Sequence, residues 1–134
     1  MINIAFIGTV GVAERHADGL RDIPKARLAD VWSRTEKNCV EFAQRHGAKA
    51  YRSMKELLAD PAISAVFILS TADTHVDYAI AALKAGKHVL VEKPVGLTSA
   101  DIARLRWPSS NKYGLLVVTC PIFCTRRCER LLHV

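Results

Sequence analysis

The chain has 134 residues, of which 50% are hydrophobic and 24% are charged, and its formal net charge is +6. This composition is typical of one globular domain and excludes a disordered chain. No stretch approaches the roughly 18 consecutive apolar residues of a membrane span, and the basic residues are scattered without aromatic platforms, so we expect no membrane contact and no nucleic-acid partner.

The amino-terminal sequence, MINIAFIG, enters a strand-like apolar run directly. It lacks the charged segment, apolar segment and cleavage site of a secretory signal, so we expect a cytoplasmic protein.

Short apolar runs alternate with helical patterns along most of the chain. Such brief runs are typical of strands that are covered on both faces. Their alternation with helices predicts the α/β class, with a doubly wound parallel sheet of the Rossmann type. The expected strands are 3–7, 27–32, 49–51, 65–69, 88–91 and 115–118.

Helix boundaries are marked by side chains that satisfy the free backbone groups at helix ends. A serine or threonine followed three residues later by an acidic residue predicts a capping box at a helix start. The pairs are Ser33 with Glu36, Ser53 with Glu56, Thr74 with Asp77 and Thr98 with Asp101, while Gly47 and Gly86 stand where helices should end.

The segment GTVGVA, residues 8–13, follows the first expected strand. A dinucleotide-binding loop needs one glycine for its tight turn, a second for close approach of the pyrophosphate, and a final small residue for helix packing. Gly8 and Ala13 fill the first and last roles, whereas Val10 takes the middle position and Gly11 beside it can restore room. A glycine that only forms a turn is the alternative. We expect the pyrophosphate to bind Gly8, Thr9, Val10, Gly11 and Val12 at the start of the helix.

The second expected strand ends in VWSRT. An acidic residue near this point binds the ribose hydroxyl of NAD, whereas an arginine accommodates the 2′-phosphate of NADP. Asp30 falls inside the strand, and Ser33 and Arg34 stand at its end. We therefore expect Ser33 and Arg34 to bind the cofactor and favour NADP over NAD. The alternative is that Ser33 only caps the next helix and Arg34 is solvated.

The stretch AALKAGKHVLVEKPVGLTSAD, residues 81–101, is the most specific part of the chain. It resembles the glucose–fructose oxidoreductase/inositol dehydrogenase (Gfo/Idh/MocA) family of NAD(P)-dependent oxidoreductases, and the similarity covers roughly residues 2–105. The resemblance implies that Glu92 contacts the nicotinamide ribose, Lys93 is the catalytic residue and Pro94 fixes the turn. A lysine near a substrate hydroxyl stabilises the developing negative charge or relays the proton.

The segment STADTH, residues 70–75, follows the strand expected at 65–69. The resemblance places Ser70 and Thr71 beside the nicotinamide half of the cofactor, and the family often has proline where Thr71 stands. His75 has two interpretations, a cofactor contact or a cap of its helix. We interpret His16 and His88 as structural.

Members of the family carry a second α/β domain with substrate contacts, an Asp and a His of the proton relay and usually the oligomer interface, and we expect these features to be absent from this chain. We therefore predict the NAD(P)-binding domain of an oxidoreductase that acts on a sugar, polyol or related alcohol, on a truncated chain that is inactive alone. The alternatives are a non-catalytic nucleotide-binding or regulatory module and a remnant without function.

The dinucleotide-binding domain is expected to span residues 1–118, followed by a divergent, basic, cysteine-rich tail at residues 119–134. Cys120, Cys124 and Cys128 recur at every fourth residue of this tail. Because no fourth ligand lies at a recognisable spacing, we expect no metal site.

The sequence RWPSSN interrupts the helix expected to begin at Thr98, since proline breaks a helix interior. One hypothesis is a shift of the coding frame close to Arg106. The alternative is a genuine short chain.

Overall fold

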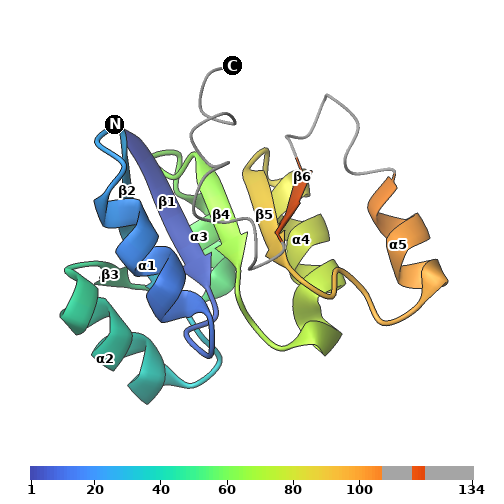
Figure 1. The fold of residues 1–134 in the computed structure, drawn as a ribbon, viewed down its shortest axis with the longest axis horizontal. Helices are drawn as coiled ribbons and strands as arrows, with labels where there is room; N and C mark the ends of the chain where they lie inside the picture. The colour runs from blue at the N-terminus through green and yellow to red at the C-terminus, as the bar shows by residue number, and fades with distance from the viewer. Residues whose placement is uncertain (107–115, 120–134) are drawn as a thin grey trace.

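The computed structural model of the chain describes residues 1–106 and 116–119. Its centre is a six-stranded sheet with the order β3-β2-β1-β4-β5-β6, in which every neighbouring pair is parallel. The chain moves outward from β1 to β3 and then returns to the other side of β1, which is the doubly wound arrangement (Figure 1). The strands are β1 (Ile2–Ile7), β2 (Ala26–Trp32), β3 (Lys49–Ala50), β4 (Ala65–Ile68), β5 (His88–Glu92) and β6 (Leu116–Thr119).

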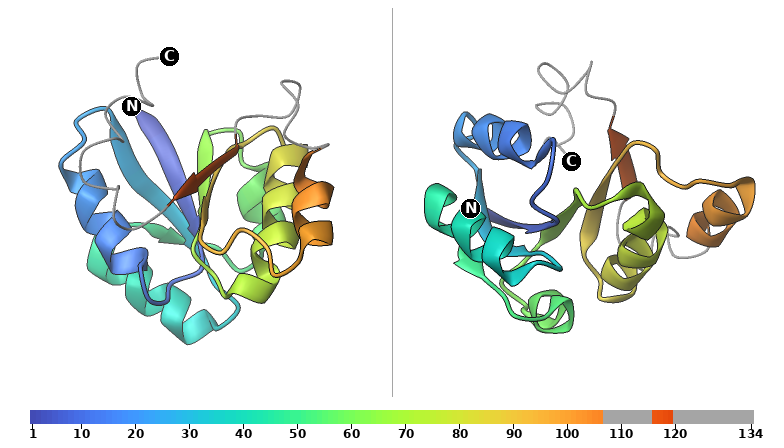
Figure 2. Two further views of the ribbon diagram at one scale, coloured as in Figure 1. Left: turned by 45° about the vertical axis from the view of Figure 1, so that its right-hand side comes forward. Right: turned by 90° about the horizontal axis from the view of Figure 1, so that it is seen from below.

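Helices cover both faces of this sheet (Figures 1 and 2). Helices α1 and α2 contribute buried side chains to one layer of the core, and α3, α4 and α5 contribute to the other. The helices are α1 (Ala13–Arg21), α2 (Glu36–His46), α3 (Met54–Ala59), α4 (His75–Lys84) and α5 (Ser99–Arg106), with a single 3₁₀ turn, η1 (Ala72–Thr74), before α4.

The central strand β1 shows why the apolar runs are continuous. Ile4 and Phe6 belong to the layer under α1 and α2, whereas Ala5 and Ile7 belong to the layer under α3 and α4. All of these side chains are at most 4% exposed. A strand that is covered on both faces must be apolar at every position, so the expected alternation of strands and helices is confirmed as a parallel sheet.

The capping residues behave in two ways. Ser53 Oγ accepts the Glu56 N–H at 3.1 Å, and Thr98 and Asp101 bond to each other's backbone N–H groups, so these two boxes are confirmed. Gly47 and Gly86, both at positive φ, end α2 and α4 as predicted.

The other two boxes are wrong. Helix α2 begins at Glu36 with Thr35 as its N-cap, so Ser33 lies outside the helix and makes no cap. Thr74 is the N-cap of α4, but its hydroxyl bonds to Ser70 Oγ and to the Thr71 carbonyl oxygen instead of the helix N–H groups. At Thr74 the hydroxyl therefore closes a local turn with residues three and four positions earlier, and at α2 the helix starts two residues later than a cap at Ser33 requires.

The last described strand, β6, ends at Thr119, one residue beyond the expected domain boundary. The cysteine-rich tail from residue 120 and the interruption at residues 107–111 lie outside the described residues. Within the described part of the chain, no helix has the length and apolar character needed to span a bilayer.

Candidate functional site

Because all strands are parallel, their carboxyl ends lie at one edge of the sheet, which is where ligands bind in doubly wound folds. The loops that follow β1, β2, β4 and β5 meet at this edge. These loops, with the adjoining ends of β5 and α4, contain every residue predicted to bind the cofactor, namely residues 8–12, Ser33, Arg34, Ser70, Thr71, His75 and residues 92–94.

The loop after β1 is pressed against the loop after β4. Gly8 has φ +102°, and a Cβ atom there would lie 2.5 Å from the backbone N of Ser70. The Gly8 N–H donates to the Trp32 carbonyl oxygen at 2.8 Å, which ties the same point to the end of β2. Only glycine fits this position, for reasons of both space and conformation.

The remainder of this loop is open to solvent. Gly11 has φ +57°, and a Cβ atom placed on it would have no neighbouring atom within 4 Å, so this glycine serves conformation and not close packing. The side chain of Val10 is 47% exposed. Val10, which replaces the expected middle glycine, therefore leaves the loop accessible to solvent.

Two polar features of the loop suit a ligand. The Thr9 hydroxyl oxygen is buried without a hydrogen-bond partner among the described residues. The Ala13 N–H of α1 bonds to the Val10 carbonyl oxygen at 3.3 Å, but no side chain caps the helix at its N-cap, Val12, so its first turn keeps backbone N–H groups that no side chain accepts from. Unpaired donors at a helix start favour an anion, and an orphaned hydroxyl supplies a further bond, so this loop fits a bound phosphate.

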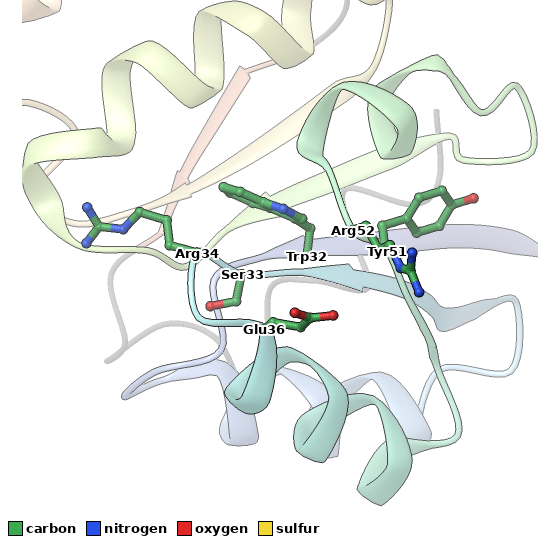
Figure 3. A pocket seen from close by; sticks show the side chains of 6 residues that line it. All are labelled: Trp32, Ser33, Arg34, Glu36, Tyr51 and Arg52. Atoms are coloured by element: carbon green, nitrogen blue, oxygen red, sulfur yellow. The ribbon is translucent and has the colours of Figure 1, made fainter.

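An open pocket of about 520 Å³ adjoins the end of β2. Figure 3 shows the side chains of Arg34 and Arg52 directed to opposite ends of this pocket, with Trp32 and the Glu36 carboxylate between them. Its lining residues are Trp32, Ser33, Arg34, Glu36, Tyr51 and Arg52. The pocket therefore offers two cations and one carboxylate.

Asp30, the acidic residue that the sequence placed inside β2, is 8% exposed and does not line this pocket. Burial, and next to it the charge of Asp60, raise the pKa of its carboxyl group. Glu36 takes the exposed acidic position instead, which sequence reasoning missed. Arg52 was missed as well, although its position two residues after β3, the neighbour of β2, was a usable signal.

The loop after β4 is organised by short polar contacts. Thr74 Oγ1 lies 2.7 Å from both Ser70 Oγ and the Thr71 carbonyl oxygen, so its hydroxyl is hydrogen-bonded within this turn. His75 is 2% exposed, and its two ring nitrogens contact the carbonyl oxygens of Pro94 and Ser70. The His75 side chain therefore does not cap its helix.

At the end of β5 the three residues Glu92, Lys93 and Pro94 differ in exposure. Glu92 is 5% exposed, and its Oε1 lies 2.7 Å from Nε2 of His16 on α1. Its Oε2 accepts the Lys93 N–H at 3.2 Å. The Lys93 side chain is exposed, so the turn presents its ammonium group to solvent while the Lys93 N–H is bonded to the buried Glu92.

His16 packs its ring edge-on against Phe6 and Phe67 as well as bonding to Glu92. This agrees with a structural histidine. The Glu92–His16 contact joins positions 76 apart in the sequence and was not foreseen, because nothing local to either residue indicates it. The described residues contain no group of three or more metal-ligating side chains.

Comparison with known proteins identifies this arrangement. The chain is 34% identical over 127 residues to 4-carboxy-2-hydroxymuconate-6-semialdehyde dehydrogenase of a Sphingobium species, covering 94% of this chain and 39% of that protein. It is 36% identical over 105 residues to myo-inositol 2-dehydrogenase of Thermotoga maritima, covering 78% of this chain and 31% of the relative. The chain thus spans between 31% and 39% of the length of these curated relatives.

Among solved structures, biliverdin reductase of Synechocystis sp. PCC 6803, in complex with biliverdin and NADP⁺, superposes with a TM-score of 0.80 at 34% identity. That match covers 87% of this chain and 37% of the reductase. Residues 2–111 match the Gfo/Idh/MocA family, described as "Oxidoreductase family, NAD-binding Rossmann fold". The chain belongs to this family, and its described residues form the family's NAD-binding domain.

Proposed function

We propose that the carboxyl edge of the sheet binds NAD(P) and that the chain is the cofactor domain of an oxidoreductase acting on a sugar, polyol or related alcohol. The observation that carries this proposal is the loop after β1, where Gly8 is packed against Ser70 while Thr9 Oγ1 has no partner among the described residues and no side chain caps the first turn of α1. A pyrophosphate laid across this loop satisfies those groups. The relatives named as dehydrogenases of myo-inositol and of a semialdehyde support a small carbonyl or hydroxyl substrate.

In this proposal the adenosine half of the cofactor lies in the pocket at the end of β2. Ser33 and Arg34 bind the 2′-phosphate, and Arg52 adds a second cation from the far end of the pocket. An exposed carboxylate favours an unphosphorylated ribose, so Glu36 opposes these cations. With two arginines against one glutamate, we infer a preference for NADP over NAD.

The nicotinamide half then extends past Ser70 and Thr71 to the turn of residues 92–94. When bound, the nicotinamide accepts or delivers a hydride, which the chain's own side chains cannot do. Lys93 is the residue that we propose to be catalytic, because its exposed ammonium group can hold the negative charge that forms on the substrate oxygen as its proton leaves. Glu92 holds this turn by accepting the Lys93 N–H. A contact between Glu92 and the nicotinamide ribose stays a prediction.

A second function is a nucleotide-binding module without chemistry. It is favoured by Val10, which replaces the middle glycine expected in a pyrophosphate-binding loop. Dehydrogenase assays of the chain with NAD⁺ and NADP⁺ across sugars and polyols test whether the chain is catalytically active alone, which neither the cofactor domain nor the non-catalytic module should be. We expect no turnover from the isolated chain, and turnover that Lys93→Ala abolishes would contradict this expectation.

The cytoplasmic location remains a prediction from the sequence.

The central experiment is a titration of the purified chain with NADPH and with NADH, followed by the fluorescence of the reduced nicotinamide. We expect weak binding of both, with NADPH tighter. Arg104→Ala is the matched control, since Arg104 is an exposed arginine paired with Asp77 and lies outside the pocket. No binding of either cofactor contradicts the proposed function, whereas equal affinities contradict only the preference for NADP.

A further inference from the structure

His75 lies at the first position of α4 and is almost completely buried. Its Nδ1 is 2.7 Å from the carbonyl oxygen of Pro94, and its Nε2 is 3.0 Å from the carbonyl oxygen of Ser70. The imidazole therefore lies between the loop after β4 and the turn after β5. A ring buried in this way, with a carbonyl group at each nitrogen, has no free edge for a ligand.

The contact with Pro94 completes a set of bonds around Lys93. On the amino side, the Lys93 N–H donates to Glu92, which is held in turn by His16. On the carboxyl side, the Pro94 carbonyl oxygen lies 2.7 Å from His75 Nδ1, which donates to it when the ring proton is on that nitrogen. The backbone that carries the exposed Lys93 side chain is thus held before and after that residue, by histidines from α1 and α4.

The contact with Ser70 connects the same ring to the pyrophosphate loop. The backbone N of Ser70 is the atom nearest to the place where a Cβ on Gly8 would lie, and Ser70 Oγ accepts from Thr74. His75 is therefore a bridge between the segment packed on Gly8 and the segment that carries Lys93.

We propose that His75 is a positioning residue for the nicotinamide end of the site. By holding the Pro94 carbonyl group it fixes the backbone of Lys93, and it makes no contact of its own with the cofactor. This inference rests on the proposed function, because it assigns a role to a residue within the same site.

Two amide substitutions separate the two contacts of the ring. An asparagine places its NH₂ group close to the position of Nδ1, so His75→Asn keeps a donor for Pro94. A glutamine places its NH₂ group close to the position of Nε2, so His75→Gln keeps a donor for Ser70 only. The pair is matched in polarity, and the difference between the two variants reports the Pro94 contact.

The binding test compares NADPH with 2′-phospho-ADP-ribose, which lacks nicotinamide. We expect His75→Gln to weaken NADPH binding on the order of tenfold, the usual effect of losing one hydrogen bond, with the affinity for 2′-phospho-ADP-ribose changed less than about twofold. His75→Asn should keep both affinities within about threefold of the unmodified chain. Equal weakening of both ligands by His75→Gln, or identical behaviour of the two variants, would overturn the proposal.

A ligand-free measurement separates this inference from the proposed function. Hydrogen exchange at the Lys93 amide should accelerate on the order of tenfold in His75→Gln and much less in His75→Asn. In the unmodified chain, an NMR scalar coupling across the hydrogen bond should link His75 Nδ1 to the Pro94 carbonyl carbon, independently of how well any variant folds. If the chain binds neither probe, the proposed function fails. Unchanged exchange in His75→Gln, or absence of that coupling, overturns the positioning role.

Discussion

The ends of β2 and β5 lie on the same edge of the sheet but are built in different ways. At the end of β2, the exposed side chains of Arg34, Glu36 and Arg52 line an open pocket. At the end of β5, Glu92 is buried against His16 and joins the site to the hydrophobic core. Substitution of the charged side chains at the end of β2 should therefore change the free energy of unfolding little. Substitution of Glu92 at the end of β5 should change it more, because the core packs around this residue.

The largest expected effect is at the point where the loops after β1 and β4 meet. Gly8→Ala places a Cβ within 2.5 Å of the Ser70 backbone and at φ +102°. We expect the free energy of unfolding to fall by about 3 kcal/mol or more, and cofactor binding to be lost with it. Urea denaturation followed by circular dichroism measures this change.

Gly11→Ala is the matched control, because φ is also positive there but the surrounding space is empty. It should cost only about 1–2 kcal/mol. Similar losses in the two variants would mean that backbone conformation, and not the contact with Ser70, explains the glycine at position 8.

The second expected effect tests whether the end of β5 is part of the core. Glu92→Leu removes the acceptor for both His16 Nε2 and the Lys93 N–H. We expect a loss of about 2–3 kcal/mol in the free energy of unfolding, since buried donors are left without partners. Glu92→Gln keeps the size and one acceptor oxygen and should lose less. If the Glu92→Leu chain were as stable as the unmodified protein, the end of β5 would not differ from the end of β2 in its contribution to stability.

The third prediction concerns the open end. Arg34→Ala should weaken NADPH binding on the order of tenfold through the loss of a charge-assisted bond to the 2′-phosphate, and should leave NADH binding nearly unchanged. Stability should change by less than about 0.5 kcal/mol, as for other exposed positions. Fluorescence titration and thermal unfolding measure the two quantities on the same sample.

Glu36→Gln sharpens this prediction because it removes the opposing charge from the same pocket. It should tighten NADPH binding and leave NADH binding equal or weaker. The reverse order would assign the pocket to an unphosphorylated ribose and correct the inferred preference to NAD.

The smallest expected effect is at Val10. Val10→Gly should tighten both cofactors by no more than about threefold, because the side chain that it removes is already half exposed and the added chain freedom opposes the gain. Titration with NADPH and NADH checks both values. Unchanged affinity would mean that Val10 does not obstruct the pyrophosphate, and the non-catalytic module would lose its support.

Much of the fold was available from the sequence because it depends on local patterns. Apolar runs of strand length, separated by helices that end at Gly47 and Gly86, predict the parallel sheet, and a parallel sheet brings the ends of β1, β2, β4 and β5 to one edge. The residues of the candidate site were therefore predictable as a group. The failed caps at Ser33 and Thr74 show the limit of such patterns, since α2 takes Thr35 as its N-cap and the Thr74 hydroxyl bonds to the turn before its helix instead of the helix N–H groups.

The sequence by itself determined the order of elements, the family and the edge of the sheet where the site lies. Only the tertiary structure decided which side chains at that edge are exposed and which are buried. Glu92 and His16 lie 76 positions apart, and His75 reaches Pro94 across 19 positions. Contacts of this kind depend on how α1 and α4 pack against the end of β5, and no periodicity or spacing in a single sequence encodes the distance between groups that packing brings together.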